Sequence, residues 1–151
     1  MKYFTMKELT KSSTADKLGI DNTPTTEASV ALSNLVTHVL DPLREMYGKA
    51  ITVNSGYRCP KLNAAVGGAK NSQHMRGEAA DITGGNKEEN KKLFELIRDN
   101  LPFDQLIEYN YKWIHVSYSS MHDNRSEILH LNHRLLAYKI NYLYIYSIII
   151  M

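Results

Sequence analysis

Apolar positions in the first half of the chain follow a helical pattern. They recur at three- and four-residue steps over residues 28–46, which predicts one helix face packed on a core. Thr23 and Pro24 fit the N-cap and first position of that helix. Pro42 predicts a kink or restart because proline lacks a backbone N–H. A second helix, with its apolar residues facing inward, is predicted over residues 86–100.

The second half of the chain has strand-like patterns around that second helix. Segments rich in β-branched and aromatic residues predict strands over residues 50–55, 79–83, 103–109 and 113–118. A glycine-containing segment, residues 56–77, separates the first two strands, and loops of that length are usually functional or disordered. Helices followed by strands mixed with one helix predict an α+β fold with an antiparallel sheet.

Composition narrows the class of protein. The 151 residues, 43% hydrophobic and 23% charged, are typical of one soluble globular domain. A net charge of +2, without a basic stripe carrying interleaved aromatics, does not favour a nucleic-acid partner. Cys59 is the single cysteine, so an intrachain disulfide and a cysteine-rich zinc site are excluded. Any metal would have to be held by His, Asp or Glu side chains.

Three side chains are candidates for such a metal site. His74 ends the glycine-containing segment, Asp81 lies in a predicted strand, and His115 lies in another. Two imidazoles and one carboxylate are a recurrent ligand set for a catalytic zinc with an open fourth position. Spacing alone leaves other interpretations open, because a buried aspartate can be a structural acceptor and His115 can be a hydrogen-bonded core residue.

The segments around these residues resemble a known family. Residues 55–60 read SGYRCP, residues 72–81 read SQHMRGEAAD, and residues 113–115 read WIH. These ordered motifs resemble the zinc D-Ala-D-Ala carboxypeptidase family, which includes dipeptidases and phage endolysins. The resemblance covers roughly residues 3–118. It implies the hedgehog/DD-peptidase type of α+β fold, with helices packed on one side of the sheet.

The resemblance also implies roles for individual residues. It implies that His74, Asp81 and His115 bind Zn²⁺, and that Arg58 contacts substrate and stabilises developing negative charge. A guanidinium is always charged and suits an oxyanion or a carboxylate, which agrees with that role. The alternatives for Arg58 are a surface ion pair or a contact that fixes its own loop.

Three further residues are expected near the substrate. Ser72 lies two positions before a ligand and would place a hydroxyl there, unless it is simply a turn residue. Tyr57 and Trp113 are candidates to line the cleft, although aromatics at such positions are as often part of a core.

The general base departs from the family pattern. Many members carry an acidic residue three positions before the last histidine ligand, where this chain has Lys112. If residues 110–111 form a two-residue hairpin loop, Glu108 opposes Trp113 and shares a face with His115. On this register we expect Glu108 to act as the base. A shift of one residue would turn it to the opposite face.

The expected function is zinc-dependent hydrolysis of peptide bonds in peptidoglycan stem or cross-bridge peptides, by a carboxypeptidase or an endopeptidase. A zinc-binding cell-wall module with weak catalysis is the main alternative, and Lys112 is its best support. An assembly protein or another zinc hydrolase, such as an amidase, also stays open. The first nine residues are too polar for a secretory signal. We therefore expect cytoplasmic synthesis and, as for a phage lysin, separate release to the wall.

The C-terminal stretch differs in composition from the rest. We expect residues 1–125 to form the zinc peptidase domain, and residues 126–151 to be an apolar extension, most simply within the same domain. Residues 142–151 read YLYIYSIIIM, which favours an extra strand, with a partner- or membrane-facing tail as the alternative. Lys139 and Asn141 interrupt the apolar run too early for a membrane span, so no firm membrane association is expected. Oligomeric state is not indicated.

Overall fold

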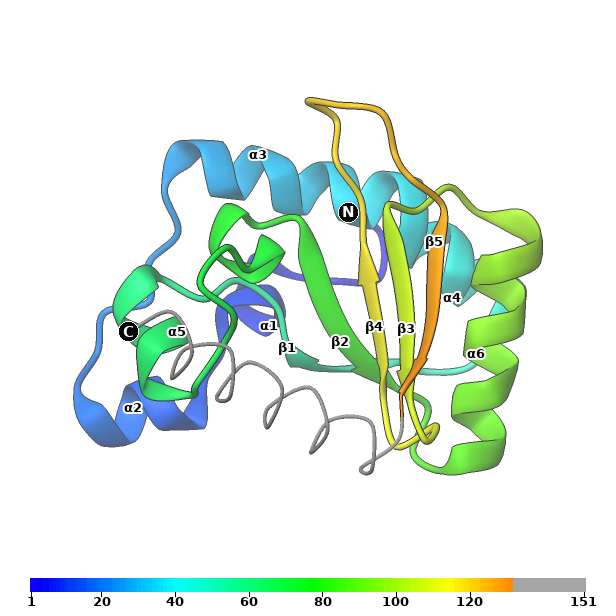
Figure 1. Cartoon of the computed structure of the whole chain (residues 1–151), viewed down its shortest axis with the longest axis horizontal. Coiled ribbons are helices and arrows are strands. Elements are labelled where there is room, and N and C mark those ends of the chain that lie inside the picture. The colour runs from blue at the N-terminus through cyan, green and yellow to red at the C-terminus, as the bar shows by residue number, and fades with distance from the viewer. Residues whose placement is uncertain (132–151) are drawn as a thin grey trace, which may run out of the picture.

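The computed structural model describes residues 1–131 (Figure 1), so the strand expected over residues 142–151 lies outside the described part. The helical elements are α1 (Met6–Thr10), α2 (Ser13–Leu18), α3 (Thr26–Leu35), the π-helix η1 (Val36–Leu40), α4 (Asp41–Tyr47), α5 (Pro60–Ala65), the 3₁₀ helix η2 (Gln73–Arg76) and α6 (Lys87–Asn100). The strands are β1 (Thr52–Ser55), β2 (Ala79–Thr83), β3 (Gln105–Tyr109), β4 (Ile114–Ser117) and β5 (Glu127–Leu131).

The long helical run begins and breaks for local reasons. Its N-cap is Thr25, two residues later than predicted, and the Thr25 hydroxyl accepts a hydrogen bond from the N–H of Ala28. The expected interruption at Pro42 is present. Proline has no N–H to donate to the preceding turn, and the N–H of Asp41 instead reaches back five residues to the carbonyl of Val36. The run therefore contains one π-helical turn between α3 and α4.

The sheet has five strands in the order β1-β2-β4-β3-β5. Neighbouring strands are antiparallel except β3 and β5, which pair in parallel. The geometry of the preceding hairpin explains this direction, because β4 ends beside the start of β3. A loop from that end delivers β5 to the free edge of β3, running the same way. β5 lies within the range predicted as the C-terminal extension, and sequence analysis missed it.

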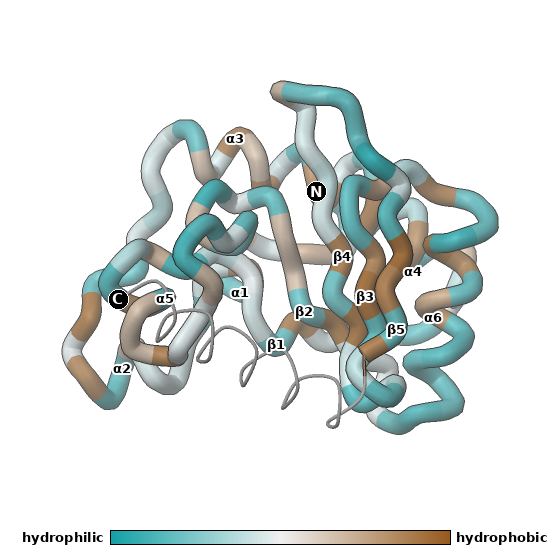
Figure 2. The backbone as a smooth tube through the Cα atoms, viewed as in Figure 1, coloured by the Kyte–Doolittle hydropathy of each residue, from teal (hydrophilic) through white to brown (hydrophobic). Residues whose placement is uncertain are grey.

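The two faces of the sheet have different chemistry because successive side chains alternate. On one face Ile82, Leu106 and Ile114 are fully buried in a core shared with the helices, including Leu32 and Leu93. Burying each such side chain stabilises the fold by about 1.5–3 kcal/mol. Figure 2 shows the apolar colouring along β3, β4 and β5 and the polar colouring of the β4–β5 loop. The expected α+β class is therefore confirmed, with the parallel edge strand as a difference in detail.

The opposite face, called here the open face, carries a row of partners that crosses the sheet. Asp81 pairs with Ser55 on β1 and with His115 on β4, and His115 pairs with Ile107 on β3. This row places two of the candidate metal ligands side by side. Among residues 1–131, no helix has the length and apolarity needed to cross a bilayer.

Candidate functional site

A cavity of about 800 Å³ lies over the open face of the sheet. Its walls come from the segment between β1 and β2, from alternate residues of β3, and from the β4–β5 loop. Of the residues singled out in the sequence, the cavity is lined by Arg58, Ser72, His74, Asp81, Trp113 and His115. Tyr57 and Glu108 do not line it.

The three candidate ligands meet at one carboxylate oxygen. Oδ1 of Asp81 lies 3.0 Å from Nδ1 of His115 and 3.4 Å from Nε2 of His74. One ligand atom from each residue lies within 4.8 Å of the others. Ligands about 2.0–2.2 Å from a tetrahedral zinc stand roughly 3.3–3.6 Å apart, so the two distances from Asp81 are close to those such an ion needs. The structure thus brings together donors that lie 41 positions apart in the sequence.

A hydrogen bond on the side of the ring away from Asp81 fixes the orientation of His74. Its Nδ1 lies 2.7 Å from the carbonyl oxygen of Gly56, and because a carbonyl only accepts, Nδ1 carries the proton. Nε2 is then the nitrogen that faces Asp81, and it would be the one to bind a metal ion. A partner of this kind is what orients a metal-binding histidine.

Gly56 holds that carbonyl in place because it packs directly on α1. A Cβ at this position would lie 2.2 Å from the carbonyl oxygen of Leu9, and the same oxygen accepts a hydrogen bond of 2.7 Å from the N–H of Tyr57. No side chain larger than hydrogen fits without moving the backbone. The N-terminal helix therefore supports the ligand His74 through the chain Leu9, Gly56 and His74.

Gly77 makes the turn between the ligands His74 and Asp81. Its φ of +72° lies in the left-handed region, and a Cβ would stand 2.3 Å from the carbonyl oxygen of Ala28. Both requirements exclude other residues at this point. The turn is therefore docked on α3, and it sends the chain straight into β2.

The electrostatics of Asp81 suit a ligand that stays ionised. Burial alone would raise the pKa of this carboxyl group, but the hydrogen bonds and charges of His115 and His74 outweigh that effect and lower it below its ordinary 3.8. The donor chemistry, two imidazoles and a carboxylate, fits zinc, and a set of three protein ligands would leave one coordination position for water or substrate. If the protein binds zinc, His74, Asp81 and His115 are the side chains that would hold the ion.

Arg58 lies beside the cluster on the edge of the cavity. Its backbone N–H donates to the carbonyl of His74 at 3.1 Å, and its Nη1 donates to Asn63 Oδ1 at 3.2 Å. The Nε atom is buried without a hydrogen-bond partner. Burial lowers the pKa of Arg58 from its ordinary 12.5, while Asp81 and Tyr109 oppose that effect. The guanidinium thus lines the same cavity as the candidate ligands, with donor capacity left over.

The other three expected contact residues differ in placement. Ser72 lines the cavity, but its hydroxyl accepts the N–H of His74 at 3.2 Å and caps η2, so the turn role is present as well. Trp113 lines the cavity and stacks on Tyr109, with ring centroids 4.5 Å apart. Tyr57 is 3% exposed and belongs to the core. It does not line the large cavity, but besides packing in the core it lines a smaller recess of about 300 Å³ together with Arg58 and Asp81.

The register expected for Glu108 is wrong. Residues 110 and 111 do form a tight turn, closed by the N–H of Lys112 on the carbonyl of Tyr109 at 3.0 Å, and both have positive φ. One additional residue then enters the β4 side, so Ile107, not Leu106, pairs with His115. Glu108 therefore faces the helices and is removed from the ligands by the sheet itself.

Glu108 has partners of its own on that face. Its carboxylate accepts the N–H of Tyr111 at 2.8 Å and lies 3.3 Å from Nδ1 of His130. With its side chain 8% exposed, it is part of the packing between β3, β5 and the hairpin turn. Nothing in this arrangement connects it to the cavity, and we withdraw it as a base.

Tyr109 occupies the position that Glu108 was expected to hold. Gln105, Ile107 and Tyr109 are the alternate residues of β3 that line the cavity. Burial and the charge of Asp81 raise the pKa of Tyr109 above its ordinary 10.0, against the opposing charge of Arg58. The phenol is therefore protonated near neutral pH, and it can donate a hydrogen bond but cannot accept a proton readily.

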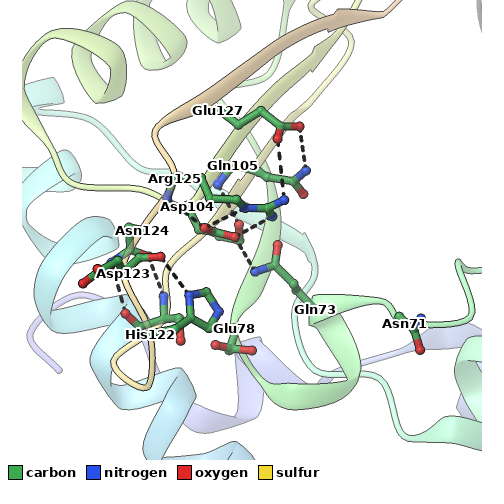
Figure 3. A network of polar contacts seen from close by, with 12 residues as sticks. Asn71, Gln73, Glu78, Asp104, Gln105, His122, Asp123, Asn124, Arg125 and Glu127 are labelled. Atoms are coloured by element: carbon green, nitrogen blue, oxygen red, sulfur yellow. Dashed lines mark hydrogen bonds and ion pairs between the residues drawn. The ribbon is translucent and has the colours of Figure 1, made fainter.

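A polar network forms the cavity wall farthest from β1 (Figure 3). Asp104 is fully buried and receives two hydrogen bonds from the guanidinium of Arg125, at 3.0 and 2.7 Å, and one from Gln73 at 2.9 Å. These contacts, chiefly those of Arg125, lower the pKa of Asp104 to about 2 against the effect of burial. Glu127 lies 3.5 Å from Arg125 on its other side.

Sequence analysis missed this network and Tyr109. Gln73 is adjacent to a ligand, and Asp104 directly precedes β3, which are weak signals. Arg125 gave no signal, because its place at the cavity depends on how the β4–β5 loop folds back. Asp81 and Asp104 are the carboxylates that line the cavity among residues 1–131. The first is a candidate ligand and the second is paired.

A metal-ligand cluster on an open sheet face, at the floor of a cavity, defines a metallohydrolase type of site. Comparison with protein families agrees: residues 2–117 match the Peptidase M15 family, and because this is most of the chain, the protein belongs to that family. The family and the cluster together bear out the expected resemblance and support the expected Zn²⁺ cofactor.

A curated relative is the zinc D-Ala-D-Ala carboxypeptidase of Streptomyces albus G. It is 49% identical over 49 residues, which are 32% of this chain and 19% of the relative. The match therefore spans about a fifth of the relative's length.

Proposed function

We propose that this protein is a zinc-dependent peptidase that hydrolyses peptide bonds in peptidoglycan stem or cross-bridge peptides containing D-amino acids. The convergence of His74, Asp81 and His115 at the floor of the large cavity is the observation that carries the proposal. Membership in the Peptidase M15 family and the name of the Streptomyces relative support the choice of metal and substrate.

The candidate ligands and three neighbouring side chains each have a distinct role in the proposed reaction. Zn²⁺ bound by the three ligands would lower the pKa of a coordinated water to about 7 and polarise a carbonyl. Arg58 directs its guanidinium to the same place and stabilises negative charge on the attacked carbonyl oxygen. Tyr109, a protonated phenol beside Arg58 and Asp81, supplies a hydrogen bond to that oxygen or to the leaving group. Trp113 holds the Tyr109 ring by stacking.

A second candidate function is a zinc-containing wall-binding module with weak catalysis. A specific observation favours it: among the described residues that line the cavity, no carboxylate is left over to accept a proton. Asp81 is a proposed ligand, and Asp104 is neutralised by Arg125. A positioned base contributes typically 10²–10⁴-fold to rate, so its absence would leave binding largely intact and hydrolysis slow.

Digestion of purified peptidoglycan separates the two candidates. The zinc-loaded protein, the chelator-treated protein and the protein reloaded with zinc are each incubated with the wall, and released fragments are identified by mass. We expect new peptide termini with zinc, none after chelation, and recovery on reloading. Stoichiometric zinc and wall pelleting without any released fragment would instead establish the binding module.

The fragment masses also settle finer points of the proposal. Loss of one terminal alanine would indicate a carboxypeptidase, and opening of cross-links would indicate an endopeptidase. Action on the wall after phage-type release, as an endolysin, is the setting we propose for either activity. Release of a whole peptide from the glycan would point to an amidase and would contradict the proposed bond.

A further inference from the structure

One polar side chain of α6 is buried among apolar ones. Asn90 is 1% exposed and lies on the same helix face as Leu93, Phe94 and Ile97, which are buried in the core. An amide group without partners in such a place would be costly, so its hydrogen bonds indicate what it does. Sequence analysis did not single it out, because its partners are distant in the chain.

All four hydrogen-bonding positions of the Asn90 amide are occupied. Its Oδ1 accepts from the Thr83 hydroxyl at 3.0 Å and from the N–H of Gly84 at 2.7 Å, where β2 ends. Its Nδ2 donates to the carbonyl oxygens of Tyr111 at 2.9 Å and Lys112 at 3.0 Å, in the turn between β3 and β4. An amide has two N–H donors and an oxygen with two lone pairs. One side chain therefore ties the end of β2 to the β3–β4 turn.

The β3–β4 turn depends on such support because its backbone is unfavourable for the residues it contains. Asn110 and Tyr111 have φ of 51° and 52°, in the left-handed region that residues other than glycine rarely adopt. Backbone of this kind persists only where the surrounding structure holds it, and it is concentrated at functional sites. Glu108 binds the N–H of Tyr111, whereas Asn90 binds the carbonyl oxygens of residues 111 and 112.

The residues on either side of this turn form the aromatic part of the large cavity. Tyr109 is the last residue of β3, and Trp113 directly precedes β4. Their rings stack with centroids 4.5 Å apart, and both line the cavity. Only residues 110–112 separate them, so a change in the turn would move both rings. The candidate ligands Asp81 and His115 have other support, because they are partners in the pairing of β2 with β4.

We propose that Asn90 is a positioning residue that fixes Tyr109 and Trp113 over the metal site. This inference rests on the proposed function and adds to it a residue that does not itself line the cavity. Asn90 acts through the carbonyl groups of the turn, which it anchors to the end of β2. Its two amide donors therefore serve the reaction, whereas zinc binding does not depend on them.

Kinetics of Asn90→Asp test this role. The variant keeps the shape and the acceptor toward β2 but removes both donors to the turn. We expect kcat on a D-Ala-D-Ala peptide to fall about 10- to 100-fold, since small displacements of aligned groups cost that much. KM and stoichiometric zinc should stay close to wild type. Ile97→Ala, on the same helix face, is the control: it should lower the unfolding temperature through a core cavity and leave kcat unchanged.

The fluorescence of Trp113 gives a readout that needs neither zinc nor hydrolysis, because it is the single tryptophan of the chain. In the metal-free protein we expect Asn90→Asp to shift its emission to longer wavelength and to increase its quenching by acrylamide. Asn90→Ala carries the same prediction without placing a carboxylate against the two carbonyl oxygens, and it serves if Asn90→Asp does not fold. Folded Ile97→Ala should keep the wild-type spectrum. Wild-type emission in a folded Asn90 variant would overturn the proposal.

The two measurements fail in different ways. If the wild-type protein hydrolyses no peptide, the proposed function fails, and the emission of Trp113 still decides whether Asn90 positions the aromatic pair. If zinc-dependent hydrolysis is present and the folded Asn90 variants keep the wild-type kcat, the function stands and the positioning role is wrong. Loss of zinc in step with activity would also contradict it, because Asn90 would then support the ligands instead.

Discussion

The sheet carries a histidine–carboxylate pair on each face, and the two pairs differ in what surrounds them. On the open face, His115 lies 3.0 Å from Asp81. On the helix face, His130 lies 3.3 Å from Glu108, and its ring packs 5.3 Å from that of Phe94. Both pairs join neighbouring strands at matched register positions.

A third candidate ligand and a cavity distinguish the pair on the open face from the pair on the helix face. His74 reaches Asp81 from η2, and the group opens to the large cavity. His130 and Glu108 have a backbone N–H and an aromatic ring around them instead. A carboxylate next to a histidine is therefore a weak indicator of function until the face of the sheet is known.

The largest effect is expected from removing one candidate ligand on the open face, because zinc binding should be lost there and not on the helix face. We expect His74→Ala to lower zinc affinity by at least about 100-fold, because loss of a mere supporting contact already costs 10–100-fold. Peptidoglycan hydrolysis should disappear with the metal. Glu108→Gln is the matched control on the other face and should keep stoichiometric zinc. Atomic absorption on the dialysed proteins measures both, and zinc loss in Glu108→Gln would contradict the assignment of faces.

The next largest effect is expected from placing a carboxylate on the open face, where it could act as a base. We expect Tyr109→Glu to hydrolyse peptides about 100-fold faster than Tyr109→Gln, the lower limit for a positioned base, because both variants lose the phenol and only the first gains a carboxylate. Tyr109→Gln has a similar shape without the charge and should not gain activity. Initial rates on a D-Ala-D-Ala peptide are the measurement. Equal rates for the two variants would show that this position does not serve the reaction.

Adding one methyl group behind His74 should disturb the metal site from a distance. In Gly56→Ala the new Cβ would meet the carbonyl oxygen of Leu9 at 2.2 Å. We expect the free energy of unfolding to fall by about 1–3 kcal/mol, as for other overpacked sites, and zinc affinity to fall about tenfold. Thr52→Ala, at an exposed position of β1, the strand that ends just before Gly56, is the control. Urea unfolding and zinc titration give the two values.

The smallest effect is expected in the wall network. The lowered pKa of Asp104, about 2, means that its ionised form is favoured in the folded protein. This contribution is complete above the unfolded pKa near 4 and is lost as the pH falls toward 2. We expect Arg125→Ala to lower stability at pH 7 by about 1 kcal/mol and to flatten this acid dependence. Thermal unfolding of the wild-type protein and of Arg125→Ala between pH 2 and 7 tests this prediction. Parallel curves of stability against pH for the two proteins would contradict it.

The longer helices and the strands β1 to β4 could be predicted from local patterns, whereas α5, η2, β5 and the register of the hairpin could not. β2 and the helix after it were predicted within a residue, because alternation and capping are encoded nearby in the sequence. β5 was missed, since its five residues form a strand only by pairing with β3. The interruption at Pro42 was predicted from the chemistry of one residue, but its form, a π-helical turn over Val36–Leu40, was not.

The candidate ligands could be chosen from their motifs, but the groups around them required the folded chain. His74, Asp81 and His115 lie in short segments whose residue types carry the signal. Glu108 was misplaced because one extra residue in a hairpin moves a side chain to the other face. No local pattern specifies such a bulge, and the same shift brought Tyr109 to the cavity.

Because Leu9 contacts Gly56, the first ten residues help to orient the imidazole ring of His74. A domain fused upstream of this short helix, or proteolytic trimming of the helix, would alter the position of His74. The effect would pass through the carbonyl groups of Leu9 and Gly56 and would need no change at a candidate ligand. Preparations that differ at their amino terminus should consequently differ in metal content. Heterogeneity there would be mistaken for partial loading unless the intact mass is checked.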